Sequence, residues 1–131
     1  MPNTITQRTL YGDASTKRVI RSIHIISDGS EETGLIIYNN SDFIADVTKG
    51  KVSAIHTSGS YGGSLRIEFD ATTNTPITSM GLGDNAGTHS YEHLGGISNP
   101  GGAGVTGDIV LTTTKLADLD ELHIILEVEQ R

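Results

Sequence analysis

Short runs of alternating apolar and polar residues, with no helical periodicity between them, are the feature that most constrains this fold. In SLRIEFD, residues 64–70, Leu65, Ile67 and Phe69 fall on one face of a strand. LHIILEVE, residues 122–129, repeats the pattern. Parallel sheets need crossover helices, and no stretch has the apolar spacing of a helix of three turns. We therefore predict an all-β fold: an antiparallel β-sandwich, or a jelly-roll-like flattened barrel, of about seven to eight strands.

Strand pairing is predicted from neighbouring runs. VIRSIHII, residues 19–26, is apolar on both faces, which predicts a strand covered on both sides. We expect it to form a hairpin with LIIYN, residues 35–39, because turn-forming residues separate the two runs. The strand at residues 108–114 is expected to pair with residues 122–129. Residues 52–57 are predicted to form a further strand, and weaker patterns predict short strands at residues 77–82 and 91–94.

The length of 131 residues fits one domain with its own core. Residues 1–16 contain few apolar side chains and several threonines, so we expect an extended N-terminal arm there. Such an arm either adds a strand to a partner's sheet edge or frays. Residues 17–131 are expected to form a single β-sandwich domain. We expect neither a secretory signal nor a membrane-spanning segment, since no apolar run is long enough.

Charge is distributed unevenly along the chain. Residues 1–51 contain six basic and six acidic side chains, so the whole net charge of −7 lies in residues 52–131. A long acidic region opposes binding of nucleic acid or anionic lipid, and we expect neither partner. Two interpretations of the charge split remain: a solvated surface, or a self-complementary one on which the basic N-terminal part of one copy meets an acidic face of the next.

The sequence GAGVTG, residues 102–107, fits the G-x-G-x-x-G pattern of a dinucleotide-binding turn. That turn needs a strand before it and a helix after it, because the helix N-terminus receives the pyrophosphate. Here Asn99 and Pro100 precede it, and the β-branched run DIVLTTT follows. We therefore interpret these glycines as residues of a sharp loop that uses positive φ angles.

Histidines provide the main candidates for metal chemistry. HSYEH places His89 and His93 four residues apart, and on a strand His24 or His56 from a neighbour would share their face, as in a cupin-like metal site. The segment misfits the H-E-x-x-H motif, because its glutamate lies beside the second histidine. We expect surface or loop histidines instead, and neither a bound metal nor a cofactor. His24 is predicted to be a half-buried sheet histidine.

The sequence contains few features that indicate a hydrolase. The chain has no cysteine and no G-x-S-x-G nucleophile elbow. Glu127 and Glu129 share one face of the last strand, which predicts a solvent face and not two carboxylates opposed across a cleft. Sugar binding remains an alternative, with Tyr61 and Tyr91 in loops as the candidate aromatic platforms.

Four segments together resemble a known class of protein. They are ITQRTLYGD, KRVIRSIHIISDGSEETGLIIYNNS, LRIEFDATT and GGAGVTGDIVLTTTKLADLDELHIILEVEQR. In order and style they resemble the small β-rich virion structural proteins of tailed bacteriophages, including marine phages and those of cyanobacteria. The likeness extends over nearly the whole chain, and THSYEHLGG departs from it. None of the segments is a specific catalytic or binding signature.

The resemblance implies a non-enzymatic capsid decoration or cement protein that stabilises the head by bridging capsid subunits. Its expected partners are the major capsid protein and copies of itself, as a trimer in preference to a dimer, and a small-molecule ligand is not expected. The chain would be made in the host cytoplasm and located on the phage head surface. The alternatives are a neck or tail component, a carbohydrate-binding module or a cupin-like metal protein. The candidate interface residues are Arg8, Lys17, Arg18, Arg21, Tyr61 and Tyr91.

Overall fold

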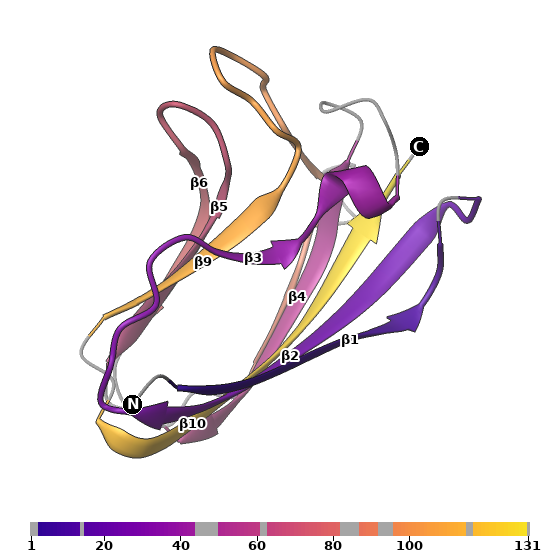
Figure 1. The fold of residues 1–131 in the computed structure, drawn as a ribbon. Coiled ribbons are helices and arrows are strands. Elements are labelled where there is room, and N and C mark those ends of the chain that lie inside the picture. Colours follow the sequence, from indigo (N-terminus) through magenta and orange to yellow (C-terminus); the bar gives the residue numbers. More distant parts are fainter. Residues whose placement is uncertain are drawn as a thin grey trace.

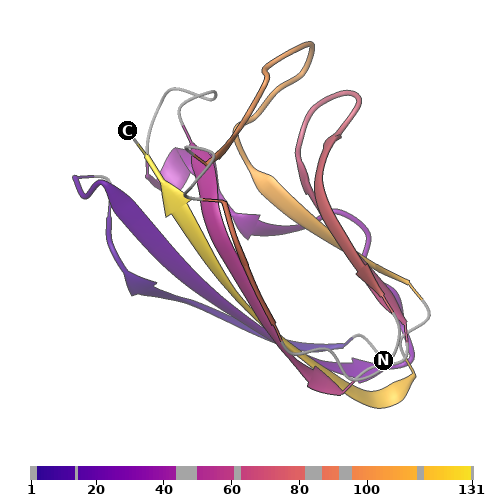
Figure 2. The ribbon, with the colours of Figure 1, turned by 180° about the vertical axis from the view of Figure 1, so that it is seen from behind.

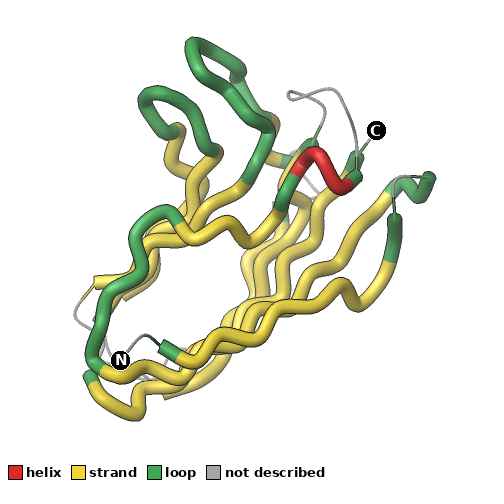
Figure 3. The backbone as a smooth tube through the Cα atoms, viewed as in Figure 1, coloured by secondary structure: helices red, strands yellow, loops and turns green. Residues whose placement is uncertain are grey.

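The computed structural model describes residues 3–13, 15–43, 50–60, 63–81, 87–91, 96–114 and 117–130. Strands dominate these residues, as Figure 3 shows, and one short 3-10 helix, η1 (Asn40–Asp42), accompanies them. The strands are β1 (Thr4–Tyr11), β2 (Arg18–Asp28), β3 (Leu35–Tyr38), β4 (Lys51–Ser60), β5 (Ser64–Phe69), β6 (Thr75–Gly81), β7 (Gly87–Ser90), β8 (Ile97–Ser98), β9 (Ile109–Thr114) and β10 (Asp118–Glu129). Within the described ranges, no helix is long and apolar enough to cross a membrane.

The strands form two antiparallel sheets that face each other (Figures 1 and 2). Sheet A has the order β1-β2-β10-β4-β7, with β8 also pairing with β4, and sheet B has the order β3-β9-β5-β6. Without β1 and β8, four strands face four in the order of a jelly roll, which is a double Greek key. The predicted antiparallel β-sandwich of jelly-roll type is confirmed, and β1 and β8 are additions to its eight strands.

Both predicted hairpins are wrong. β2 pairs with β1 and β10 in sheet A, whereas β3 pairs with β9 in sheet B. In the same way β9 lies in sheet B and β10 in sheet A. Each of these strands contributes one face to the core, and consecutive strands bury those faces against each other across the sandwich when the connection crosses from one sheet to the other.

The core lies between the sheets and follows the predicted alternation. Its completely or almost completely buried side chains include Val19, Ile23, Ile25, Leu65, Ile67, Phe69, Ile109, Leu111, Leu122, Ile124, Leu126 and Val128. The other face of β2 differs from the expectation, because Ile20 is only half-buried and Ile26 is 37% exposed. Among the described elements, sheet A is covered on one face only, so the prediction of a strand covered on both sides is wrong.

Residues 4–11, expected in an extended arm, form β1 within the chain's own sheet. The register runs from Thr4 opposite Ile26 to Thr9 opposite Arg21. Ile5 packs against the core, and the Gln7 side-chain amide donates to the Ile36 carbonyl of sheet B at 3.2 Å. Strand addition therefore occurs here within the molecule, and β1 is the outermost strand of sheet A (Figure 1, indigo).

The glycine-rich loop before β9 folds back on the turn between β5 and β6. The Thr72 amide donates to the Ala103 carbonyl at 3.0 Å. Gly104 and Gly107 have φ angles of 73° and 79°, and a Cβ on Gly107 would lie 2.6 Å from the Asn40 side chain. A strand follows the loop, so the interpretation of GAGVTG as a sharp turn with positive φ angles is confirmed.

Candidate functional site

The face of sheet A that points away from sheet B, called the outer face here, has an unusual set of side chains. Because alternate residues of a strand point to opposite faces, β2 directs Ile20, Ser22 and His24 outward, opposite its buried residues. The register places His123 of β10 beside His24 and Thr6 of β1 on its other side. The consecutive strands β1 and β2 thus meet β10, which is distant in sequence, on one surface.

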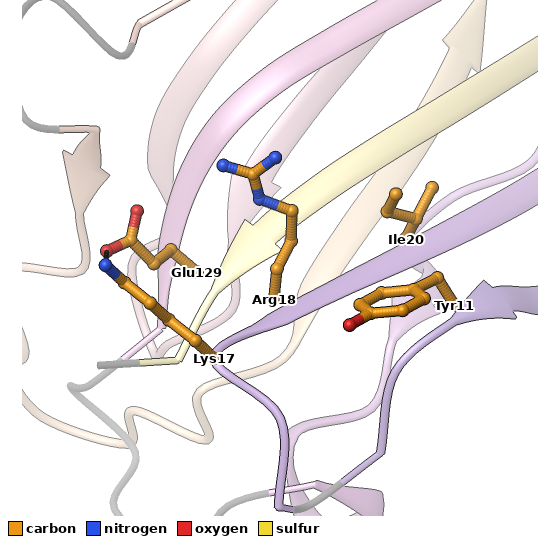
Figure 4. Close-up of a pocket in the computed structure, with 5 residues that line it drawn as sticks. All are labelled: Tyr11, Lys17, Arg18, Ile20 and Glu129. Atoms are coloured by element: carbon orange, nitrogen blue, oxygen red, sulfur yellow. Dashed lines mark ion pairs between the residues drawn. The ribbon is translucent and has the colours of Figure 1, made fainter.

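A cavity of about 460 Å³ lies at one end of this surface (Figure 4). It is lined by Tyr11, Lys17, Arg18, Ile20 and Glu129. The Lys17 ammonium lies 3.6 Å from a Glu129 carboxylate oxygen, and Arg18 Nη1 lies 3.6 Å from Glu127 Oε1. These ion pairs hold both cationic side chains across β10.

A β-bulge places the tyrosine in this cavity. The register of β1 and β2 shifts between Thr9 and Tyr11, so Tyr11 and not Leu10 lies opposite Ile20. A bulge redirects the following side chain, and here it brings the aromatic ring to the outer face. Tyr11 is 56% exposed, and Figure 4 shows its ring beside Ile20.

A second cavity of about 470 Å³ lies further along the same strands. Its lining consists of Thr6, Arg8, Ser22, His24, Glu121 and His123. Ser22 Oγ and His123 Nε2 are hydrogen-bonded at 2.8 Å, and His24 Nε2 and Glu121 Oε1 at 2.6 Å. The two imidazoles meet edge to face, with centroids 5.6 Å apart. Four of the six lining side chains are therefore hydrogen-bonded to one another in pairs.

The Ser22–His123 pair has the spacing of a nucleophile and a base, but not the surroundings. A catalytic base is oriented by a third group, and the carboxylate nearby in register, Glu121, is hydrogen-bonded to His24. Ser22 lies in the middle of β2 between two paired strands, where backbone N–H groups take part in the sheet. The described residues thus offer a binding surface with donors and acceptors and not a completed triad.

The predicted histidine site falls partly outside the described residues. The backbone of His89 lies in β7 opposite Ile55, and His93 is not among the described residues. In the part of the chain that the structure describes, no three His, Cys, Asp or Glu side chains are grouped to hold a metal ion. His24 is 36% exposed, which confirms the predicted half-buried sheet histidine.

The candidate interface residues separate into two groups. Arg8, Lys17 and Arg18 line the two cavities of the outer face. Tyr91 is half-buried against the core, and its amide donates to the Ser53 carbonyl at 2.8 Å. Tyr61 lies outside the described residues.

Arg21, in contrast, is used inside the molecule. Its guanidinium donates to the Ile37 carbonyl at 3.2 Å, to Thr9 Oγ1 at 2.8 Å and to Gln7 Oε1 at 3.0 Å. Burial lowers the pKa of this guanidinium from its usual value. Arg21 therefore joins the edges of the two sheets, because it points to the inner face of β2.

The sequence did not single out Tyr11, Ser22 or His123 as site residues. Alternation in the run that forms β10 already placed His123 opposite the apolar residues of its strand, whereas the run that forms β2 was interpreted as apolar on both faces and gave Ser22 no polar one. The register that unites them with β1 could not be deduced, since Thr6 and His123 are far apart in sequence. The bulge that turns Tyr11 outward has no glycine of its own to mark it.

The sequence matches no protein-family model and no curated protein. Among solved structures, the chain is similar to Peruvianin-I, a cysteine peptidase from Thevetia peruviana latex, at 8% identity and TM-score 0.41, covering 96% of this chain and 61% of that one. It is similar to a cupin-2 domain from Rhodospirillum rubrum at 11% identity and TM-score 0.35, and the match covers 100% of this chain and 64% of that one. It is also similar to a family 29 carbohydrate binding module at 7% identity and TM-score 0.37, where the match covers 96% of this chain and 88% of that one.

This chain spans less than two thirds of the length of the first two of these proteins. The similarities concern the fold, and none of them supplies an activity or a ligand for this chain.

Proposed function

We propose that this chain is a non-enzymatic structural protein of a bacteriophage particle, which attaches to its partner through the free edge of β1. The observation that supports this attachment most is that β1 is a long, regularly paired edge strand. Thr4 to Thr9 form six consecutive pairs with β2, and among the described residues no strand lies on the other side. A long regular edge strand is a template for a further strand.

The other long edge of the sandwich is protected, which makes the β1 edge distinctive. β6 contains Pro76, and its register with β5 shifts between Ile67 and Glu68. Proline removes a backbone donor, and register irregularities discourage pairing with another chain. β1 has no proline, Arg8 is its single charged residue, and its own register shift follows the six regular pairs from Thr4 to Thr9.

Exposed apolar side chains lie beside the same edge. Leu10 of β1 and Ile36 of β3 are each 43% exposed. The two edge strands are joined by the hydrogen bond from Gln7 to the Ile36 carbonyl. A partner strand paired with β1 would therefore gain backbone hydrogen bonds together with apolar contacts, which is the usual combination in strand addition.

The assignment to a phage particle is supported by the sequence resemblance described above. Jelly rolls also serve as viral capsid domains, although they equally form lectins and cupins, so the fold is an analogy and not a proof of function. We propose a capsid decoration or cement protein on the head surface, bound to the major capsid protein and to copies of itself, with a trimer preferred. A neck or tail component is the alternative location.

Quantitative mass spectrometry of purified particles tests this proposal. Particles from the phage that encodes the chain are separated from lysate by density gradient, and peptide abundance is compared with that of the major capsid protein. We expect the chain in the particles at a constant ratio close to that of the major capsid protein. A few copies per particle would indicate the neck or tail, and absence from particles with abundance in the lysate would refute the proposal.

A further inference from the structure

We propose that the two cavities of the outer face form one groove that binds a short uncharged oligosaccharide. The groove consists of the side chains that line the two cavities on β1, β2 and β10 and at the adjoining Lys17. This binding activity is separate from attachment through the β1 edge. A strand added to that edge would extend sheet A and leave its outer face open.

Tyr11 provides the apolar platform that a sugar ring requires. Its side chain is 56% exposed, and the bulge between Thr9 and Tyr11 holds it beside Ile20 (Figure 4). Aromatic rings combine a large apolar surface with a polar hydroxyl and few rotatable bonds, so they bind amphipathic ligands with little loss of entropy. An exposed ring beside an aliphatic side chain matches the less polar face of a sugar.

The rest of the groove offers donors and acceptors in alternation. Donors come from Arg18 and Arg8, and carboxylate acceptors come from Glu129 and Glu121. Glu121 is hydrogen-bonded to His24, and Glu129 is ion-paired with Lys17, across the strands. Neighbouring donors and acceptors suit hydroxyl groups, which donate and accept together.

The dimensions favour a short chain of sugars over a single ring. Ile20 and His24 are four residues apart on β2, which corresponds to roughly 13 Å at about 3.3 Å per residue. The two cavities, of about 460 and 470 Å³, lie at these two positions. Each volume is within the usual range for a ligand site, about 300–1,000 Å³.

Charge favours an uncharged ligand over a polyanion. Glu121 and Glu129 line the groove, and Glu127 lies beside Arg18. Lys17 and Arg18 are each paired with a carboxylate of β10, and the chain has a net charge of −7. A sulfated or uronic-acid polymer would approach three carboxylates, which opposes its binding.

Calorimetric titration and a glycan array test this inference. The probes are neutral gluco-, manno-, galacto- and xylo-oligosaccharides, with sulfated and uronic-acid oligosaccharides of matched length. We expect at least one neutral series to bind and Tyr11→Ala to weaken its binding about tenfold, because a stacking contact of this kind contributes about one factor of ten. Tyr11→Phe should retain most of the affinity.

Leu10→Ala is the matched control, since Leu10 is exposed on the same strand but lines neither cavity. It should bind as the unmodified chain does, and Arg8→Gln, at the other cavity, should weaken binding several-fold. Circular dichroism confirms that each variant is folded. The inference is overturned if no neutral oligosaccharide binds, if the anionic ones bind more tightly, or if Leu10→Ala weakens binding as much as Tyr11→Ala.

Discussion

At the scale of single residues, burial decides which polar groups support the fold and which remain available for binding. Tyr38 is completely buried, stacks on Phe43 with centroids 5.1 Å apart, and its hydroxyl donates to Gln130 Oε1 at 3.4 Å. Arg21 is likewise engaged between the sheets. Tyr11 and Arg8 are exposed on the outer face instead. One tyrosine and one arginine thus stabilise the fold, whereas another of each is exposed on the outer face, and the sequence alone did not distinguish the two roles.

Tyr38 gives the fold a defined response to alkali. Burial, and to a smaller extent the Asp108 carboxylate, raises the pKa of Tyr38 from 10.0 to about 12. The folded chain therefore holds the phenol proton more tightly than the unfolded chain does. This group's contribution to the free energy of unfolding is complete below pH 10.0 and is lost as the pH rises towards about 12.

We expect Tyr38→Phe to remove this loss, because a phenyl ring has no proton to release. The free energy of unfolding, measured by urea titration at several pH values between 10.0 and about 12, should fall less steeply for Tyr38→Phe than for the unmodified chain. Tyr11→Phe serves as the control, because Tyr11 is exposed. Parallel decline of Tyr38→Phe and the unmodified chain would contradict the explanation.

At the scale of elements, alternation in the sequence predicts the faces of strands better than their partners. The inward residues of the runs at 64–70 and 122–129 were predicted correctly because a strand covered on one side needs only a local pattern. The pairings of β2 with β10 and of β3 with β9 are non-local, and nearness in sequence favoured hairpins that do not form. The candidate groove depends on these pairings, so it could not be predicted from the sequence.

β1 is the element for which sequence and structure differ most. Its eight residues contain few apolar side chains, which suggested an arm, yet Ile5 packs against the core and Gln7 binds Arg21. The inner face of β1 supports the sandwich, and its outer face contributes Thr6, Arg8 and Tyr11 to the two cavities. Among the described residues, no strand pairs with its other edge, where we propose that a partner strand binds.

We therefore expect deletion of residues 1–11 to destabilise the isolated domain. The deletion removes the packing of Ile5 and two acceptors of the Arg21 guanidinium, Gln7 and Thr9. The bond to Gln7 is partly buried, and losing a hydrogen bond to a charged group of this kind costs about 1.5–3 kcal/mol, so a clear decrease in melting temperature should follow. Ile5→Ala, with the strand otherwise intact, should cause a smaller decrease. An unchanged melting temperature after the deletion would show that β1 does not belong to the folded domain.

At the scale of the whole molecule, the sandwich separates three surfaces with different chemistry. The core joins sheets A and B, the outer face of sheet A has two cavities, one of them lined by Tyr11, and among the described residues no further strand pairs with the β1 edge. A particle protein that docks through the edge would carry the proposed groove in many copies. Individually weak contacts then gain strength through repetition.

Hydrogen–deuterium exchange of β1 tests the central claim most directly, because attachment through the edge must protect the amides that point away from β2. The chain is compared free in solution and bound to particles, and the β4 peptide, which lies inside sheet A, serves as the internal reference. We predict fast exchange for about half of the amides between Thr4 and Thr9 in the free chain, since alternate residues of an edge strand are unpaired, and strong protection on the particle. Bound chain whose β1 amides exchange as fast as in solution would contradict attachment through this edge.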